Sequence, residues 1–148
     1  MHKFKYFIFL IPFLVGSFAH ADCSTPEEVE KTISEIDSTD MLNQKKERQL
    51  VNQVEQYQLA NKWTNERRKQ FAYDIISSPE FNELEKQKLE IYENLKSVMP
   101  PEFFSIDKKV ADLAACENFP IVLDAFQKTH ELIMQQQTFT LEKAKEEK

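Results

Sequence analysis

The sequence predicts an all-α fold, a compact bundle of five to six helices in which one disulfide ties the N-terminal segment to the rest. Three observations predict it. The only glycine, Gly16, lies in the apolar N-terminus, so the remaining chain lacks the residue that tight turns use most. No Asn-Gly or Asp-Gly pair is present to form a two-residue hairpin. Helix starts, in contrast, are marked repeatedly by a capping residue followed by proline or glutamate.

The N-terminus has the pattern of a signal peptide. Two lysines precede an apolar run over residues 6–18, and a motif of small residues ends at Ala21. The run is shorter than the ~20 residues of a membrane-spanning helix. We therefore expect residues 1–21 to be a signal peptide that is cleaved after Ala21. Residues 22–148 are then a single helical domain, periplasmic or secreted, with no membrane anchor after cleavage.

The two cysteines, Cys23 and Cys116, are predicted to form a disulfide. Asp22 argues against a lipid anchor on Cys23, because that modification requires a small residue immediately before the cysteine. A zinc site needs about four sulfur or nitrogen ligands, and the mature chain adds only one histidine. An even number of cysteines in an exported chain favours a disulfide, which contributes roughly 4 to 5 kcal/mol in the chain-entropy model. Two buried or intermolecular thiols are the alternative interpretation.

The composition excludes several classes of function. Without glycine, residues 22–148 contain neither a phosphate-cradling loop nor the glycine-flanked nucleophile turn of many hydrolases. His130 is the one histidine of these residues, and no local pattern places it in a catalytic triad. We expect His130 to be a surface or boundary residue of the last helix. The sequence thus predicts a protein that is not an enzyme, with no catalytic, cofactor-binding or metal-binding residue and no cofactor.

The first predicted helix begins with a capping box. Thr25 is the expected N-cap, and Pro26 and Glu28 follow at the positions typical of a first turn. The polar stretch "DSTDML" (residues 37–42) is expected to end this helix and to supply a new cap. The second helix then runs to about Lys62, with a polar middle at residues 43–49. Apolar residues recur at helical spacing in both predicted helices: Val29, Ile33, Ile36, Leu42, Leu50, Val54 and Tyr57.

The next two predicted helices are capped by Thr64 and Ser78. Pro79 opens the second of them, and Pro100–Pro101 ends it, because proline lacks a backbone donor and disfavours helical geometry in the residue before it. The inward positions are predicted to be Phe71, Ala72, Ile75 and Ile76 in the first, and Phe81, Leu84, Ile91, Tyr92, Leu95 and Val98 in the second.

The C-terminal third is predicted to form two helices. One covers roughly Pro101 to Glu117, and Asn118–Pro120 separates it from a long last helix. Residues 142–148 are expected to be a frayed, solvated tail. The predicted inward residues are Phe103, Ile106, Val110 and Leu113, then Val122, Phe126, Ile133 and Leu141.

Charge is segregated along the chain. Residues 22–40 carry a net charge of −6, residues 41–70 of +4, and residues 71–107 of −5. The basic run "ERRKQF" is either a docking surface for an acidic protein or phosphate-bearing surface, or an ordinary solvated helix face. Adjacent phenylalanines in "PPEFF" cannot both face one core from a helix, so one either packs under a neighbouring helix or is an exposed anchor. The predicted partner-binding residues are Trp63, Arg67, Arg68, Lys69, Phe103 and Phe104.

These observations predict an exported, non-enzymatic domain that binds another protein. An inhibitor or immunity factor for a toxin or hydrolase is the most concrete form. The acidic net charge and the compartment argue against nucleic acid as a partner. A periplasmic stress chaperone (holdase) and a carrier of a small apolar ligand are the alternatives.

Overall fold

The computed structural model describes residues 21–147, so the predicted signal peptide lies outside the described residues except for Ala21. Over this range the chain forms helices and no strand, which confirms the all-α fold class. The elements in order are α1 (Pro26–Ala60), α2 (Asn65–Ile76), α3 (Pro79–Val98), the 3₁₀ helix η1 (Pro101–Phe104), α4 (Lys108–Glu117) and α5 (Phe119–Glu146).

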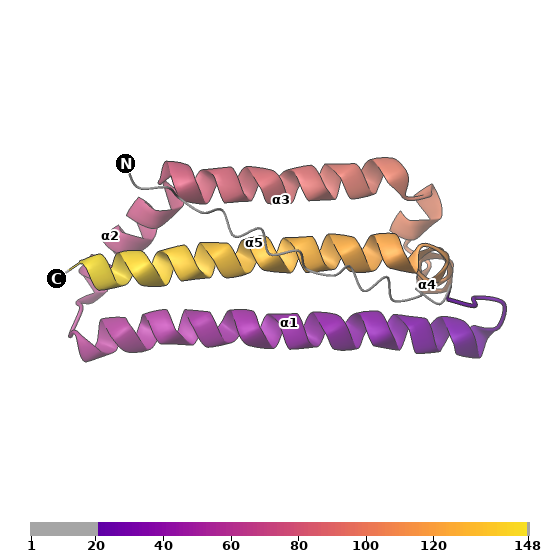
Figure 1. Cartoon of the computed structure of the whole chain (residues 1–148), viewed down its shortest axis with the longest axis horizontal. Coiled ribbons are helices and arrows are strands. Elements are labelled where there is room, and N and C mark those ends of the chain that lie inside the picture. Colours follow the sequence, from indigo (N-terminus) through magenta and orange to yellow (C-terminus); the bar gives the residue numbers. More distant parts are fainter. Residues whose placement is uncertain (1–20, 148) are drawn as a thin grey trace, which may run out of the picture.

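The three long helices lie side by side, with α5 between α1 and α3 (Figure 1). Helix α5 is the main packing partner of both α1 and α3. Helix α2 connects α1 to α3 at one end of the molecule, and η1 and α4 connect α3 to α5 at the other end. The result is an elongated arrangement whose central element is α5.

Helix α1 is one continuous helix, so the predicted break at residues 37–42 is wrong. The hydroxyls of Ser38 and Thr39 donate to the backbone carbonyls of Ser34 and Glu35, and in this way they satisfy their polar groups without ending the helix. Asp40 accepts a hydrogen bond from Gln44 one turn later instead of capping a new helix. The capping box at the start of α1 is present as predicted.

Helices α2 and α3 begin at the predicted caps, since Thr64 and Ser78 each accept a backbone N–H of the first turn. Two inward predictions for α2 are wrong: Ala72 and Ile76 are exposed, because the helix buries only the face of Phe71 and Ile75. In α3 the predicted Tyr92 and Val98 are more than half exposed. No residue of α3 is fully buried.

The predicted helix over residues 101–117 is divided in two. Helix η1 ends at Phe104, and the carboxylate of Asp107 accepts the N–H of Lys109 to cap the separate helix α4. This register turns Ile106, Val110 and Leu113 toward solvent, contrary to expectation. The buried residues of α4 are the small ones, Ala114, Ala115 and Cys116.

The disulfide is formed as predicted. Cys23 is bonded to Cys116, which is almost completely buried, so the segment before α1 is fixed to the end of α4. The frayed tail, in contrast, was a wrong prediction. Helix α5 extends to Glu146, and Ala144 has no exposed surface because it packs in an apolar cluster.

The apolar core consists of two clusters at opposite ends of the three long helices. The first contains Ile36, Met99, Ala115 and Val122, with Phe103, Phe119 and Phe126 packed against it. The second contains Trp63, Phe71, Ile75 and Ala144, with Tyr57, Phe81 and Phe139 packed against it. Most of the buried polar side chains, among them Asn43, His130 and Gln136, lie between these clusters along α1 and α5.

Removing the disulfide tests how much the N-terminal connection stabilises the fold. We expect Cys23→Ala/Cys116→Ala to lower the free energy of unfolding by about 4 to 5 kcal/mol, because the unfolded chain regains the freedom of the 93-residue loop. Urea denaturation measures the change. A reductant should destabilise the wild type by a similar amount and leave the double variant unaffected; a wild type indifferent to reductant contradicts the expectation.

Lys62, in the turn between α1 and α2, is the described residue that has a left-handed backbone, with φ of 57°. Any residue with a Cβ atom is disfavoured there, by roughly 1 kcal/mol relative to glycine, because Cβ lies too close to the following carbonyl oxygen. Lys62→Gly should therefore raise the urea midpoint. The matched control is Lys46→Gly in the middle of α1, which should lower stability by about 1 kcal/mol. Equal effects of the two substitutions would contradict this account of the turn.

Candidate functional site

A polar layer crosses the middle of the molecule between the two apolar clusters. His130 of α5 is buried, and its Nδ1 lies 2.8 Å from Oε1 of Glu47 in α1. The prediction that His130 is a surface or boundary residue is therefore wrong. Asn43 is also buried, and its Nδ2 has no hydrogen-bond partner within residues 21–147. These side chains line a groove of about 380 Å³ between α1, α3 and α5.

The same layer links α3 to α5 through Glu85. Its carboxylate lies 2.6 Å from Nζ of Lys88 and accepts a hydrogen bond of 2.7 Å from Nε2 of Gln136. These contacts hold the pKa of Glu85 below its ordinary value, and the hydrogen bond from Lys88 has the largest effect. The layer thus contains polar contacts from α5 to both of its long neighbours.

The structure separates the predicted basic docking residues. Trp63 is only 4% exposed and stacks edge-on against Phe71 in the second apolar cluster. The guanidinium of Arg67 lies 4.2 Å from the centre of the Trp63 ring and 3.7 Å from the carboxylate of Glu147. Arg68 is half-buried, and Lys69 is exposed. Arg67 therefore contacts Glu147 near the C-terminal end of α5, and Lys69 is the one exposed residue of the four.

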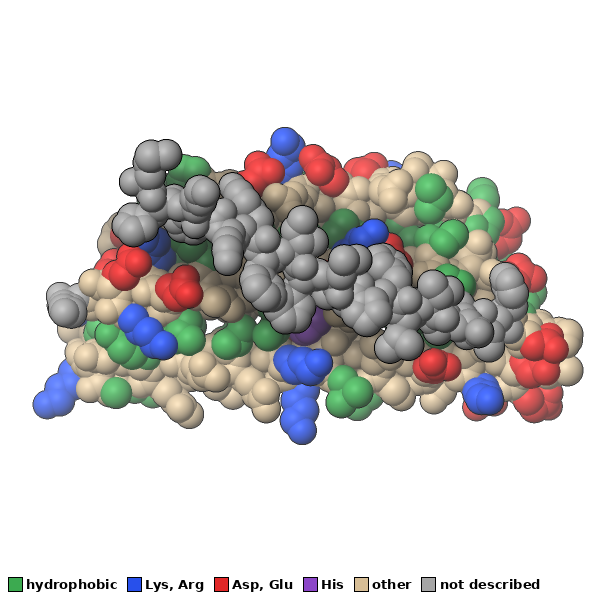
Figure 2. Space-filling view, viewed as in Figure 1, with side chains coloured by type: hydrophobic (Ala, Val, Ile, Leu, Met, Phe, Trp, Pro, Cys, Tyr) green, Lys and Arg blue, Asp and Glu red, His purple; other side chains and the backbone are tan. Residues whose placement is uncertain are grey.

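Phe103 and Phe104 are placed differently from each other. Phe103 packs against the first apolar cluster, and Phe104 is 44% exposed, with its ring edge-on to Phe103 at 5.0 Å. Ile106, two residues further on, is fully exposed. Hydrophobic side chains gather at this end of the molecule, where α3 meets η1 (Figure 2).

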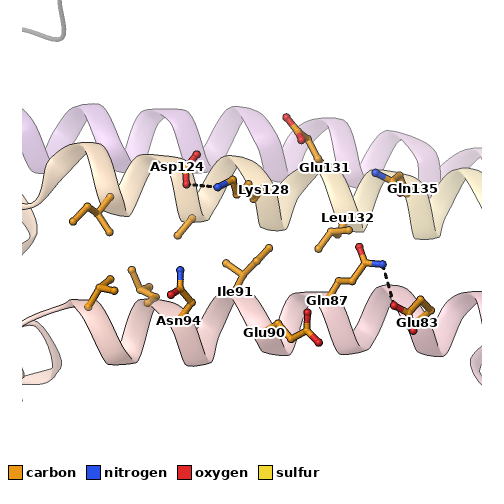
Figure 3. A pocket seen from close by; sticks show the side chains of 14 residues that line it. Glu83, Gln87, Glu90, Ile91, Asn94, Asp124, Lys128, Glu131, Leu132 and Gln135 are labelled. Carbon is orange, nitrogen blue, oxygen red and sulfur yellow. Dashed lines mark hydrogen bonds and ion pairs between the residues drawn. The ribbon is translucent and has the colours of Figure 1, made fainter.

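A second groove of about 640 Å³ runs along the seam between α3 and α5, and we call it the α3–α5 groove. Ile91 of α3 and Leu132 of α5 point toward one another across it (Figure 3). Glu83 and Glu90 lie on the α3 side, and Asp124 and Glu131 lie on the α5 side. Leu95, Val98, Ile121 and Ala125 complete its apolar surface.

Sequence reasoning missed this groove, although both of its sides carry a recognisable pattern. Polar residues recur at intervals of four, three and four residues along each helix, beside the apolar stripe. On α3 they are Glu83, Gln87, Glu90 and Asn94, and on α5 they are Asp124, Lys128, Glu131 and Gln135. Nothing in the sequence indicates that these two stripes are neighbours.

A third pocket, of about 650 Å³, lies beside the disulfide between the start of α1 and α4. Cys23, Val29, Ile33 and Leu113 supply its apolar lining. Lys108 and Asp112, which form an ion pair, lie at its edge with Lys109.

Comparisons of the chain with protein-family models, with curated proteins and with solved structures find no match. In residues 21–147, no helix is both long enough and apolar enough to cross a membrane. The same part of the chain contains no cluster of three or more His, Cys, Asp or Glu side chains suited to a metal ion.

The contacts of Glu85 predict a pH dependence of stability. Folding lowers the pKa of Glu85 from its ordinary value of 4.5. The ionised carboxylate therefore stabilises the protein at pH values above 4.5, and this contribution is lost as the pH falls through the lowered pKa. Glu85→Gln should cost roughly 0.5 kcal/mol near neutral pH, because the side chain is partly solvated, and less at about pH 3. Urea denaturation at both pH values measures it. Glu93→Gln on the same helix controls for the loss of one negative charge, and an equal pH dependence in both variants contradicts the assignment.

Proposed function

We propose that this protein is an exported, non-enzymatic binding protein that docks another protein on the exposed side of α3. The main observation in favour of this proposal is that α3 packs against one long helix, α5, and has no fully buried residue. Leu89, Tyr92 and Val98 are all more than half exposed on it. A partner that covers such a helix buries apolar surface, and each Å² removed from water favours binding by about 25 cal/mol.

Export is part of the proposal. The N-terminal pattern is that of a signal peptide, and the Cys23–Cys116 disulfide is typical of oxidising compartments. A rigid helical domain that covers a site on its partner acts by occlusion and needs no chemistry of its own. An inhibitor or immunity factor for a toxin or hydrolase is therefore the form of this function that we propose.

Capture of a partner tests the proposal. Immobilised residues 22–148, with the disulfide formed, should retain one protein in near-stoichiometric amount from the native exported fraction of the producing cells. The triple variant Arg67→Glu/Arg68→Glu/Lys69→Glu should retain the same protein, because Arg67 already contacts Trp63 and Glu147 and Arg68 is half-buried. Circular dichroism must first show that the triple variant is folded.

Absence of any stoichiometric partner would overturn the proposal. Loss of the partner in the folded triple variant would instead place the contact on the basic run at the start of α2.

A holdase is the second candidate, because Phe104, Ile106 and Ile121 add exposed apolar surface at the α4 end. Suppressed aggregation of several unrelated unfolded proteins, without one tight partner, would favour it.

The pocket beside the disulfide favours the third candidate, a carrier of a small apolar ligand. A ligand that co-purifies in native mass spectrometry would support that function.

A further inference from the structure

The α3–α5 groove offers an apolar floor of limited width. On the α5 side, Ala125 and Leu132 are buried, and on the α3 side, Ile91 and Leu95 are half-buried. Val98 and Ile121, at the end near α4, are more exposed. Side chains of a ligand that reach this floor must be apolar, because the floor itself offers them no hydrogen-bonding side chain.

The two edges of the groove carry an excess of negative charge. Glu83, Glu90, Asp124 and Glu131 line it, and Lys128 is the one cation among the described lining residues. Lys128 is already paired with Asp124 at 2.7 Å, and Glu90 lies 3.9 Å from Lys86, a cation outside the groove lining. Glu83 and Glu131 are left without an ion-pair partner within residues 21–147. A ligand on the floor lies within one Debye length of these charges, so cations flanking its apolar side chains are favoured.

The length of the groove suits a helix. Its α3 side extends from Glu83 to Val98, which spans about 22 Å at 1.5 Å per residue. A helix of about four turns covers this length and presents apolar residues at intervals of three and four on one face.

We infer that the α3–α5 groove binds a basic amphipathic helix of the partner protein, with an apolar face on the seam and Lys or Arg on both flanks. This inference rests on the proposed function and specifies the chemistry of its partner. The carboxylates contribute to the rate of encounter as well as to affinity, because they steer a basic segment toward the groove.

A second copy of this chain fits the groove less well. Its cations near the middle of α1, Lys45, Lys46 and Arg48, lie within the wholly polar residues 43–49. That segment supplies charge and no apolar side chain for the floor. In the other basic segment, at the start of α2, Arg67 contacts Trp63 and Glu147, and the apolar face of Phe71 and Ile75 is buried in the second apolar cluster. An anionic membrane surface is disfavoured by the carboxylates on both edges.

Two synthetic peptides of 16 residues serve as probes. They share the same Leu residues at helical spacing, and the flanking positions are all Lys in one and all Glu in the other. In fluorescence anisotropy at low salt, the Lys peptide should bind residues 22–148 at least about tenfold more tightly than the Glu peptide. The preference should shrink as salt is added.

Charge reversal locates the site. Glu83→Lys/Glu90→Lys alters two exposed residues of α3 and should abolish the preference for the Lys peptide. The control Glu35→Lys/Glu55→Lys makes the same change in net charge on exposed positions of α1 and should leave most of the preference intact. Equal loss in both variants would mean that net charge alone attracts the peptide, which overturns the inference.

Other outcomes also overturn it. The inference fails if neither peptide binds or if both bind equally. It also fails if the protein self-associates in sedimentation and the groove variant prevents this, since that result assigns the groove to a second copy. If the captured partner is retained equally by Glu83→Lys/Glu90→Lys, the groove inference fails and the proposed function stands. If no partner is captured, the proposed function fails whatever the peptides do.

Discussion

The packing of α1 and α3 on α5 is the constraint on which the rest of the structure depends. Because the central helix has long neighbours on two sides, it is the element that must be compatible with both at once. It contributes Val122 to one apolar cluster and Ala144 to the other, and between them His130 and Gln136 contact different neighbours, α1 and α3. A shift of α5 along its axis would break both of these polar contacts, so the polar layer fixes the register that the apolar clusters alone leave less defined.

The sequence predicted the features that local chemistry determines. Caps such as Thr25, Thr64 and Ser78 act through their own first turn, and Pro79 has the same effect in any context, so these helix starts are where they were expected. The disulfide was predictable because the described chain has no other cysteine. The break at Ser38 and Thr39 was wrong because their hydroxyls have two uses, capping a helix or bonding back to the preceding turn, and tertiary packing of α1 along α5 selects the second.

The candidate site was largely inaccessible to sequence reasoning. Trp63 and Arg67 were singled out by residue type, but the structure uses them to close one end of the core and to hold Glu147. Glu83, Glu90, Asp124 and Glu131 were missed, since acidic residues are abundant in this chain and their meaning depends on which two helices are neighbours. The buried position of His130 could not be predicted from its local sequence, because its hydrogen-bond partner Glu47 is 83 residues away in the chain.

The disulfide gives the chain the topology of a lariat. Cys23 and Cys116 close a covalent ring that contains α1, α2, α3 and α4, and α5 is the linear tail that leaves the ring and lies between two of its segments. A proteolytic nick anywhere within the ring leaves the two pieces joined, whereas a nick just after Cys116 detaches the helix that every long element packs against. In a compartment that contains proteases, the short connection at Glu117 and Asn118 is therefore the point where a single cut does most damage, and Asn118 is partly shielded there by its position between two helices.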